Sequence, residues 1–509
     1  MASEVKTLPP HETGNFSSTQ DTVFGPARNQ KCEELGKVTE LFRDESVNLP
    51  LNLTNIFHIF REEALKYGDT YNQHLIPVLE PFMVEEKFET AWYRLSGSSV
   101  WLKDYNVHLV VSRLLVSEFE LQDHPRLSVL LAQVFDEAWN EIDDVRLVFP
   151  TNNVEGSPGF ETGDAHFHLF RFPRILPLPF DIGQVHKYWG AEDPRMTLVT
   201  NKNGHQEPLI TFNAFHVKSD IDKSQPDVEG KRSIFMSLPF QFQRGKQIEA
   251  ADTDATTEQW FARTRQLRIE GEQEQKIDKN WVPFVTGADG PNEHVMFAAL
   301  LDPLKVIRCD LWTNNTECAL EHAEPGEVGR LRGGTPLTSV KIIEEEDREY
   351  FVGLARANLQ KCGCGNKFYR PNIVVLARTG KRWKLTRVSS FVDLGMEIQL
   401  WRLNENVCTR VNAMIPNGIE FWDLQNDIMS VEASVSDKTV ERVHLKGVLK
   451  ALEDMNYLEI PGNIGMESPV HCALKASADF CKAYGDLHLR PLAEKTSKTI
   501  RAAIFGETH

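Results

Sequence analysis

Residues 208–216 read PLITFNAFH and residues 232–240 read RSIFMSLPF, two short runs of β-branched and aromatic side chains. Similar runs are HFHLFRF (166–172), MTLVTN (196–201), HVMFAALL (294–301), EYFVGLARAN (349–358), NIVVLAR (372–378) and WKLTRVSSFVDLG (383–395). Runs of this kind, separated by Gly, Pro, Asn and Asp, predict β-strands. Because most of them follow one another without helix-length periodicity, they favour an antiparallel propeller or large sandwich over a parallel α/β sheet. A mainly β fold is predicted, with a β-propeller preferred.

The flanking segments have different patterns. Residues 1–45 are polar and lack sustained periodicity, which predicts a disordered tail or stem. A helical N-terminal region is predicted over 46–148, a β-propeller domain over 149–455 and a C-terminal helical extension over 456–509. The stretches with helical spacing are NIFHIFREEALKYG (55–68), VHLVVSRLLVSEFELQ (107–122), RLSVLLAQVFDEAWNEI (126–142) and KTVERVHLKGVLKALEDM (438–455).

Composition excludes several classes of protein. The chain has 509 residues and a formal net charge of −17, which argues against a nucleic-acid partner because such binding depends on clustered Lys and Arg. Aromatic residues make up 9% and charged residues 25%, as in ordinary globular proteins. No run approaches the roughly 18 apolar residues that cross a bilayer, so a soluble protein is expected.

The cysteines and paired carboxylates give little support for a metal. The chain has eight cysteines and no CxxC pair, so a zinc site is not predicted. Cys309 and Cys318 flank a turn-like segment and form either a disulfide or two buried thiols. The D-x-D pairs at 220–222 and 252–254 lie in very hydrophilic stretches, which are typical of solvated loops. No metal and no cofactor are predicted.

The motif GAEDPR (190–195) places two carboxylates before a proline and an arginine. In an extended segment Asp193 and Arg195 project to the same face. Asp193 is therefore a candidate general acid or base, with Arg195 holding an anionic group. A structural ion pair at a turn is the alternative.

Two further motifs carry cations beside turn-forming residues. KNWVPF (279–284) offers Lys279 as a phosphate or hydroxyl ligand and Trp281 as an apolar platform for a sugar. LRGGTP (331–336) has Arg332 followed by two glycines, whose missing side chains would let a ligand approach the backbone. An ordinary surface turn explains the second motif equally well.

The loop KCGCGNKFYRP (361–371) precedes a predicted strand and contains Tyr369 and Arg370. A binding role and a corner fixed by disulfides are both compatible with it.

Taken together, several segments resemble the fungal β-1,2-mannosyltransferases, and the CGCG-x-x-FYRP loop is the most specific of them. They are LRGGTP, FVGLARANLQKCGCGNKFYRPNIVVLAR (351–378), RVSSFVDLG (387–395), IPNGI (415–419) and SVSDKTVERVHLKGVL (434–449). The resemblance covers most of residues 150–455. It implies an enzyme of cell-wall biogenesis that adds β-linked mannose to mannan, taking mannose from GDP-α-mannose with inversion.

The same resemblance implies a location in the Golgi or secretory pathway, with an N-terminal membrane anchor that is not seen in this sequence. A soluble or cytoplasmic protein is expected if the N-terminus is complete.

A looser resemblance runs through GAEDPR, KNWVPF and RGGTP to the inverting β-mannoside phosphorylases, which are five-bladed β-propellers. It implies five blades here and Asp193 as the catalytic residue, acting as a base toward the acceptor hydroxyl. The substrate-binding residues that the two resemblances together imply are Glu192, Arg195, Lys279, Asn280, Trp281, Arg332, Gly333, Gly334, Tyr369 and Arg370. A β-mannoside phosphorylase or hydrolase is the alternative enzyme, and a carbohydrate-binding propeller is the alternative without catalysis.

Overall fold

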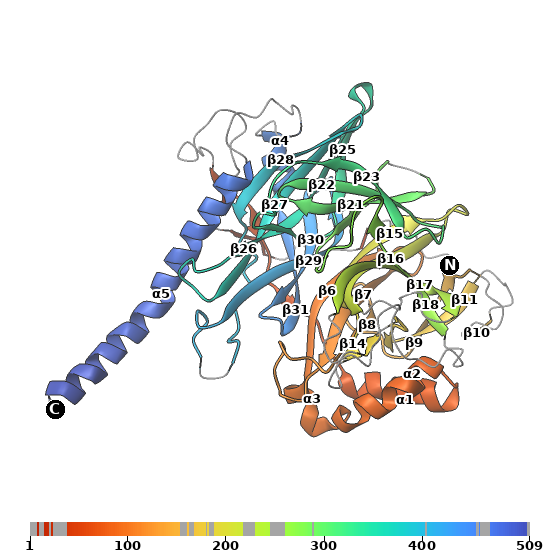
Figure 1. Cartoon of the computed structure of the whole chain (residues 1–509), viewed down its shortest axis with the longest axis horizontal. Coiled ribbons are helices and arrows are strands. Elements are labelled where there is room, and N and C mark those ends of the chain that lie inside the picture. The colour runs from red at the N-terminus through yellow and green to blue at the C-terminus, as the bar shows by residue number, and fades with distance from the viewer. Residues whose placement is uncertain are drawn as a thin grey trace.

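The strands of this protein form several sheets that follow one another along the chain (Figure 1). The structure is a computed structural model. It describes residues 8–9, 15–19, 22–23, 38–152, 160–161, 167–179, 181–182, 188–216, 230–244, 260–287, 290–402, 405–454, 458 and 469–505. Within these residues the fold is mainly β, as predicted, and no sheet closes on itself.

The first half of the chain supplies three sheets. The β6–β8 sheet contains β6 (Trp92–Leu102), β7 (Val107–Val116) and β8 (Leu127–Phe135), with the short strands β12 (Arg174–Ile175), β13 (Asp181–Ile182) and β14 (Tyr188–Trp189). A small sheet contains β9 (Val145–Pro150), β10 (Phe160–Glu161) and β11 (Phe167–Phe172). The β15–β18 sheet contains β15 (Glu192–Thr200), β16 (Gln206–His216), β17 (Lys231–Arg244) and β18 (Trp260–Gln266).

The second half supplies the remaining large groups of strands. The β19–β23 sheet contains β19 (Arg268–Ile269), β20 (Val282–Phe284), β21 (His294–Leu301), β22 (Leu304–Asp310) and β23 (Glu317–Ala323). The β24–β28 group contains β24 (Leu331–Gly333), β25 (Thr338–Ile343), β26 (Arg348–Leu359), β27 (Lys367–Thr379) and β28 (Arg382–Phe391). The β29–β31 group contains β29 (Val411–Asp423), β30 (Ile428–Val435) and β31 (Thr439–Lys446), and joins the β24–β28 group through a short parallel pairing of β27 with β29.

The five large groups of strands contact one another in a circular order. Strand β6 contacts both β15 and β29, β15 contacts β20, and β21 contacts β24. The pairing of β27 with β29 links the last two groups. Segments that are far apart in sequence are therefore brought to a common centre.

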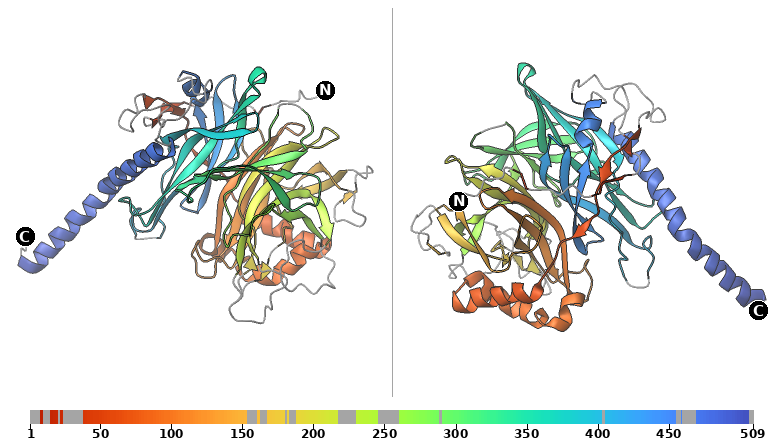
Figure 2. Two further views of the ribbon diagram at one scale, coloured as in Figure 1. Left: turned by 45° about the horizontal axis from the view of Figure 1, so that its top comes forward. Right: turned by 180° about the vertical axis from the view of Figure 1, so that it is seen from behind.

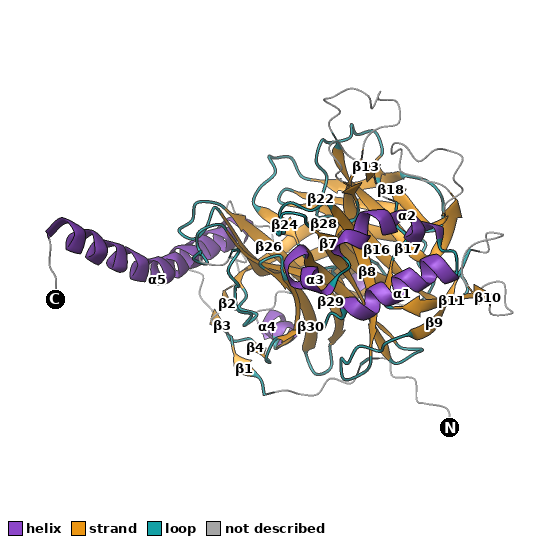
Figure 3. Cartoon of the chain, turned by 90° about the horizontal axis from the view of Figure 1, so that it is seen from below, coloured by secondary structure: helices purple, strands orange, loops and turns teal. Residues whose placement is uncertain are grey.

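Three helices cover the outer face of the β6–β8 sheet, as Figure 3 shows from below. They are α1 (Leu53–Lys66), α2 (Thr70–Leu79) and α3 (Glu85–Ala91), with the short 3-10 helix η2 (Glu80–Phe82) between α2 and α3. Phe57 and Phe60 of α1 pack in one apolar cluster with Leu114 and Val129 of the sheet. The helices α1 and α2 are capped by Asn52 and Asp69, whose side chains accept hydrogen bonds from backbone N–H groups of the first turn.

The helical prediction for 107–122 and 126–142 is wrong, because these stretches contain β7 and β8. Both faces of the sheet are buried: Leu114 packs against the helices, while Val111 and Leu130 pack against the β15–β18 sheet. A strand buried on both faces is apolar along its whole length, so its sequence loses the alternation that distinguishes it from a buried helix.

Two further expectations about the ends of the domains are corrected. The stretch 438–455 is a strand followed by the short helix α4 (Val448–Asp454), not one amphipathic helix. Within the expected tail, Leu41 is fully buried and β4 (Phe42–Arg43) pairs with β31, so this part belongs to the folded body. A strand of two residues is held by backbone pairing and leaves no periodic pattern in the sequence.

Other short elements complete the description. They are β1 (Ser17–Ser18), β2 (Thr22–Val23), β3 (Val38–Thr39), β5 (Val47–Asn48) and the 3-10 helix η3 (Glu344–Glu346). The D-x-D pairs at 220–222 and 252–254 lie outside the described residues.

A long helix, α5 (Pro469–Phe505), projects from the body in both views of Figure 2. Its beginning packs on the β24–β28 group, where Phe480 stacks on Phe391 with ring centroids 3.7 Å apart. Among the described helices, none is both long and apolar enough to cross a membrane.

Three disulfide bonds can be placed among the described residues. Cys309 pairs with Cys318, which settles the alternative left open by the sequence in favour of a disulfide. In the CGCG loop, Cys362 pairs with Cys481 of α5 and Cys364 pairs with Cys408. The loop is thus a corner fixed by disulfides between β26, β29 and α5.

Replacing Cys364 and Cys408 together by serine is expected to lower the free energy of unfolding by about 2–5 kcal/mol, because the bond closes a long loop. Guanidinium unfolding of the double variant measures this loss. The matched control is the Cys309 and Cys318 double serine variant, whose bond spans a sequence separation of 9 instead of 44. An equal or larger loss in the control would contradict the loop-closure explanation.

Candidate active site

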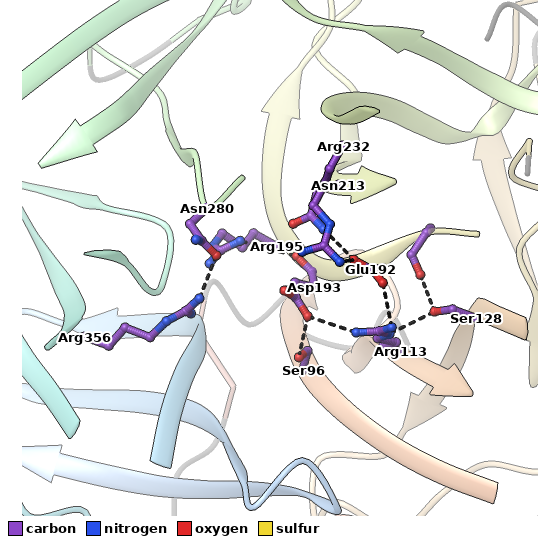
Figure 4. A network of polar contacts seen from close by, with 11 residues as sticks. Ser96, Arg113, Ser128, Glu192, Asp193, Arg195, Asn213, Arg232, Asn280 and Arg356 are labelled. Atoms are coloured by element: carbon purple, nitrogen blue, oxygen red, sulfur yellow. Dashed lines mark hydrogen bonds and ion pairs between the residues drawn. The ribbon is translucent and has the colours of Figure 1, made fainter. Parts of the chain in front are cut away.

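Asp193 lies where the β15–β18 sheet meets β6 and β29 (Figure 4). Its backbone has φ of +51°, in a region that non-glycine residues seldom adopt. The pairing of β15 with β16 shifts register between Glu192 and Arg195, so the GAEDPR motif forms a bulge, not a regular strand. Bulges and strained backbone of this kind often orient a side chain at a functional site. Here the carboxylate of Asp193 accepts a hydrogen bond from Ser96 Oγ at 3.3 Å.

Glu192 is held in place by three neighbours. Its Oε1 lies 2.9 Å from Arg113 Nη2, and its Oε2 lies 2.7 Å from Arg232 Nη2. Asn213 Nδ2 also donates to Oε2 at 3.0 Å. Both oxygens are therefore engaged within the protein, and Glu192 orients the two arginines beside Asp193. One of them, Arg113, places Nη1 3.5 Å from Asp193 Oδ1.

Arg195 joins the GAEDPR and LRGGTP motifs. Its guanidinium is buried, and it donates to the carbonyls of Gly334 through Nε and of Gly333 through Nη2. It also donates to the carbonyl of Asp193 through Nη1 at 3.3 Å. Burial and then the charge of Arg356 lower the pKa of Arg195 to about 9, so the group stays charged at neutral pH. Its donors face backbone, which makes Arg195 an anchor between motifs and not the predicted substrate ligand.

The glycines of LRGGTP have a different role from the predicted one. A Cβ on Gly333 would lie 2.2 Å from the carbonyl oxygen of Asn280, and one on Gly334 would lie 2.3 Å from that of Leu354. Both are needed because neighbouring backbones approach closely, and no opening for a ligand is required to explain them.

Cations from two other motifs face the same centre. Asn280 is buried with φ of +66° and accepts a hydrogen bond from Arg356 Nη2 at 2.6 Å. Arg356 on β26 is the cross-strand partner of Arg332 on β24. Burial, and then the charge of Arg232, lower the pKa of Lys279, whereas the charge of Asp193 raises it.

The predicted apolar platform at Trp281 is wrong. Its side chain is 2% exposed and packs beside Phe297 in an apolar cluster, so the ring offers no open face of the kind on which a sugar stacks. The cluster lies between the β15–β18 and β19–β23 sheets.

Tyr369 and Arg370 lie on opposite faces of β27, because successive strand residues alternate. Burial raises the pKa of Tyr369, and Arg356 and Asp437 are the first charged groups that act on it, so its ring belongs to the centre. Arg370 instead lies over the ring of Phe368 at 4.0 Å and near that of Tyr484 on α5 at 5.4 Å. The expected substrate contact of Arg370 is therefore wrong.

A second carboxylate, Asp437, lies in the turn between β30 and β31, with φ of +52°. Burial and then the charge of Asp193 raise its pKa to about 6, against the opposing charges of Arg113 and Arg356. Burial acts upward on the pKa of Asp193 too, but Arg113, Arg356 and the other nearby arginines outweigh it and hold that pKa below its usual range. Arg113 and Arg356 act on both carboxylates, yet Asp193 is the more acidic group and Asp437 the less acidic one.

Sequence reasoning missed four charged residues of this centre, Arg113, Arg232, Arg356 and Asp437, and also Ser96, which donates to Asp193. Arg113 and Arg356 are single charges within apolar strand sequences, VVSRLLV and GLARAN, and that interruption is a usable signal. Asp437 lies inside the SVSDKT stretch that carries the family resemblance, but a turn aspartate by itself is too common to be singled out. Among the described residues, no group of three or more His, Cys, Asp or Glu side chains is placed to hold a metal ion.

The centre of this mainly β protein contains two carboxylates, Asp193 and Asp437, surrounded by arginines, an arrangement that suits an enzyme acting on sugars. Comparison with known proteins identifies the family. A family model described as beta-mannosyltransferases matches residues 31–480. Beta-mannosyltransferase 2 of Candida albicans (strain SC5314) is 33% identical over 502 residues, covering 90% of this chain and 75% of that protein. The chain belongs to the β-mannosyltransferase family and is a glycosyltransferase.

Solved structures give weaker matches. One from the GH130 family of mannoside phosphorylases has a TM-score of 0.37 and 9% identity, covering 69% of this chain and 84% of that chain. A GDP-Man-dependent mannosyltransferase from Leishmania mexicana has a TM-score of 0.35 and 10% identity, covering 75% of this chain and 94% of that chain.

Replacing Asp437 by Asn is expected to stabilise the fold at neutral pH. Because the folded-state pKa of about 6 exceeds the usual 3.8, the folded protein retains this proton more tightly than the unfolded chain. The contribution of Asp437 to the free energy of unfolding therefore falls as pH rises from about 4 to about 6, and it does not recover at higher pH. Denaturant unfolding of both proteins measures the difference, which should be small near pH 4 and favour Asp437→Asn near pH 7. A wild-type protein that is the more stable near pH 7 would contradict this.

Proposed function

We propose that this enzyme is an inverting β-1,2-mannosyltransferase that transfers mannose from GDP-α-mannose to a mannoside or mannan acceptor in cell-wall glycan synthesis. Membership of the β-mannosyltransferase family supports the reaction class. The observation that carries the mechanism is the proximity of two carboxylates, Asp193 and Asp437, to the cations Arg356, Arg113 and Lys279. The family resemblance supports the donor and the linkage.

The proposed displacement needs a base on one side of the sugar and cations on the other. The acceptor 2-hydroxyl oxygen attacks C1 of mannose, and the bond from C1 to the diphosphate oxygen breaks on the opposite face. The hydroxyl proton passes to the carboxylate of Asp193, which is ionised at neutral pH because the arginines lower its pKa. Asp437 is the second candidate for this base, because its pKa of about 6 lies closer to neutral pH, where proton transfer in both directions is efficient.

Lys279, Arg332 and Arg356 are the proposed ligands of the departing diphosphate. Fixed cations next to a leaving group stabilise the negative charge that develops on it. Lys279 is exposed, and its ammonium is near enough to Asp193 and Arg356 for their charges to change its pKa. Tyr369 lines the same centre and is proposed to contact the sugar, whereas Arg195 and Glu192 position the other groups.

We also propose that the body is a five-bladed β-propeller. The circular order of contacts through β6, β15, β20, β24 and β29 supports this arrangement, with the site at its axis. Ser96 and Arg113 come from the β6–β8 sheet and contact Asp193, which argues against a catalytic domain that begins at residue 149. The proposed catalytic body therefore includes the β6–β8 sheet.

The proposed location is the secretory pathway, with the Golgi as the family resemblance suggests. Three disulfides support an oxidising compartment, since cytosolic thiols are kept reduced.

The reaction is tested by incubating the purified protein with GDP-mannose and short β-mannosides and determining the linkage formed. Release of GDP with a new β-1,2 linkage is the expected result. Release of mannose 1-phosphate from a mannoside in phosphate buffer would instead identify a phosphorylase, and ligand binding without turnover would identify a carbohydrate-binding module.

Asp193→Asn is expected to lower the transfer rate by about 10²-fold or more, as is typical when a positioned base is lost. Asp437→Asn is the paired variant, and the base is whichever residue gives the larger loss in kcat. Both variants are expected to stay folded, because the ion pairs of Glu192 with Arg113 and Arg232 remain in each of them. Circular dichroism checks this. Unchanged turnover in Asp193→Asn would remove that residue from the mechanism.

Lys279→Ala and Arg332→Ala are each expected to raise KM for GDP-mannose by about tenfold, because each removes a charge-assisted contact to the diphosphate. Initial rates at varied donor concentration measure this. Lys381→Ala is the matched control, since Lys381 is an exposed lysine in the turn between β27 and β28 and should leave KM unchanged. Equal effects in all three variants would show that only overall charge matters.

A further inference from the structure

A cavity of about 430 Å³ opens beside the proposed active site. It lies between the β15–β18 and β19–β23 sheets, next to the loop from Glu272 to Trp281. Lys279, Asn280 and Arg332 line this cavity and also belong to the cationic side of the centre. A diphosphate held by Lys279 and Arg332 would thus carry its remaining substituent directly to the cavity.

The cavity has apolar walls at its mouth. Ile277 and Val328 line it, and each is 54% exposed, so both side chains offer apolar surface to a ligand. Leu267 and Trp281 also border the cavity but are almost fully buried, so the exposed apolar surface comes from Ile277 and Val328. Apolar walls of this kind suit a flat ring system, such as a purine base, that needs its faces covered.

Three carboxylates line the same cavity, but they are not equivalent. Glu272 pairs with Lys305 at 2.7 Å, and Glu274 pairs with Arg268 at 2.7 Å. Asp278 is half-buried, and no Lys or Arg among the described residues lies within ion-pair distance of it. Burial raises its pKa, and the charge of Lys305 opposes that rise. The Asp278 side chain also takes part in a hydrogen bond with Trp281. Because each carboxylate oxygen has two lone pairs, both oxygens of Asp278 can still accept hydrogen bonds from a ligand.

We propose that this cavity binds the nucleoside of the sugar donor and selects guanine, with the carboxylate of Asp278 accepting hydrogen bonds from both N1–H and the 2-amino group. The inference rests on the proposed function, because it takes the diphosphate to lie on Lys279 and Arg332. A carboxylate has two parallel acceptors that match these two donors. Adenine presents an acceptor at N1, which would face the carboxylate unpaired, so adenine nucleotides are rejected.

The acceptor mannoside is the competing occupant, since carboxylates also bind sugar hydroxyls. The cations at the inner end favour the nucleoside diphosphate, because Lys279 and Arg332 bind a charged diphosphate more strongly than the hydroxyls of an uncharged mannoside. The proposal also explains why two aliphatic side chains are exposed at the mouth, where a polymer of hydroxyls would prefer polar groups.

The test is titration calorimetry of the whole protein with GDP, inosine diphosphate and xanthosine diphosphate, for wild type and Asp278→Asn. Wild type should bind GDP at least tenfold more tightly than inosine diphosphate, which lacks the 2-amino group. In Asp278→Asn the amide offers one acceptor and one donor, which match N1–H and the 2-oxo group of xanthine. That variant should lose about tenfold or more in GDP affinity and gain affinity for xanthosine diphosphate.

Glu272→Gln is the matched control, because Glu272 lines the same cavity but is paired with Lys305. It should leave the preference among the three nucleotides unchanged. A poorly folded variant would lose affinity for all three nucleotides. A gain in affinity for xanthosine diphosphate therefore cannot result from poor folding.

The outcomes separate this proposal from the proposed function. If wild type transfers mannose from GDP-mannose but Asp278→Asn keeps the wild-type preference, the cavity assignment is overturned and the function stands. If Asp278→Asn loses affinity for a short mannoside instead of for GDP, the cavity belongs to the acceptor and the proposal is overturned. If wild type binds none of the three nucleotides, the proposed donor fails and this proposal fails with it.

Discussion

The candidate active site depends on one buried guanidinium. Arg195 is 2% exposed and donates to the carbonyls of Gly333, Gly334 and Asp193. A buried charge is tolerated only when its donors are matched by acceptors, so these carbonyls must stay where they are. The two glycines allow that approach because a side chain at either position would collide with a neighbouring backbone. The contact thereby ties β15 to β24 and fixes the backbone on which Asp193 stands.

Around this anchor, the charges are arranged so that two carboxylates differ in acidity. Arg113 and Arg356 act on both Asp193 and Asp437, but Asp193 is held ionised while Asp437 has its pKa raised to about 6. Two neighbouring carboxylates repel each other when both are ionised, so ionising the second one is less favourable. Asp193 has more arginine neighbours than Asp437 and therefore ionises at lower pH. This separation gives the site an ionised group and a group that changes its protonation near neutral pH, which is the combination that acid–base chemistry requires.

Much of the fold could be predicted from the sequence, including helix α1, but strands β7 and β8 of the N-terminal part could not. Runs such as PLITFNAFH alternate well enough to identify β16, whereas VHLVVSRLLV of β7 is buried on both faces and has no period to detect. For the candidate site, the three motifs GAEDPR, KNWVPF and LRGGTP could be found from the sequence because their Pro, Gly and Asn residues mark irregular backbone, and the structure brings them together. Which way each side chain points is not encoded in the motif: Trp281 enters the core and Arg370 turns to α5.

The sequence by itself determined that this chain is a mainly β protein of the β-mannosyltransferase family, since strand texture and motif identity are local properties. Only the tertiary structure decided which groups meet. Arg113, Asp193, Arg356 and Asp437 come from β7, β15, β26 and the turn after β30, and their separations in sequence carry no information about their separations in space. The pKa values of the two carboxylates follow from this arrangement, because the interaction between two charges weakens as the distance between them grows.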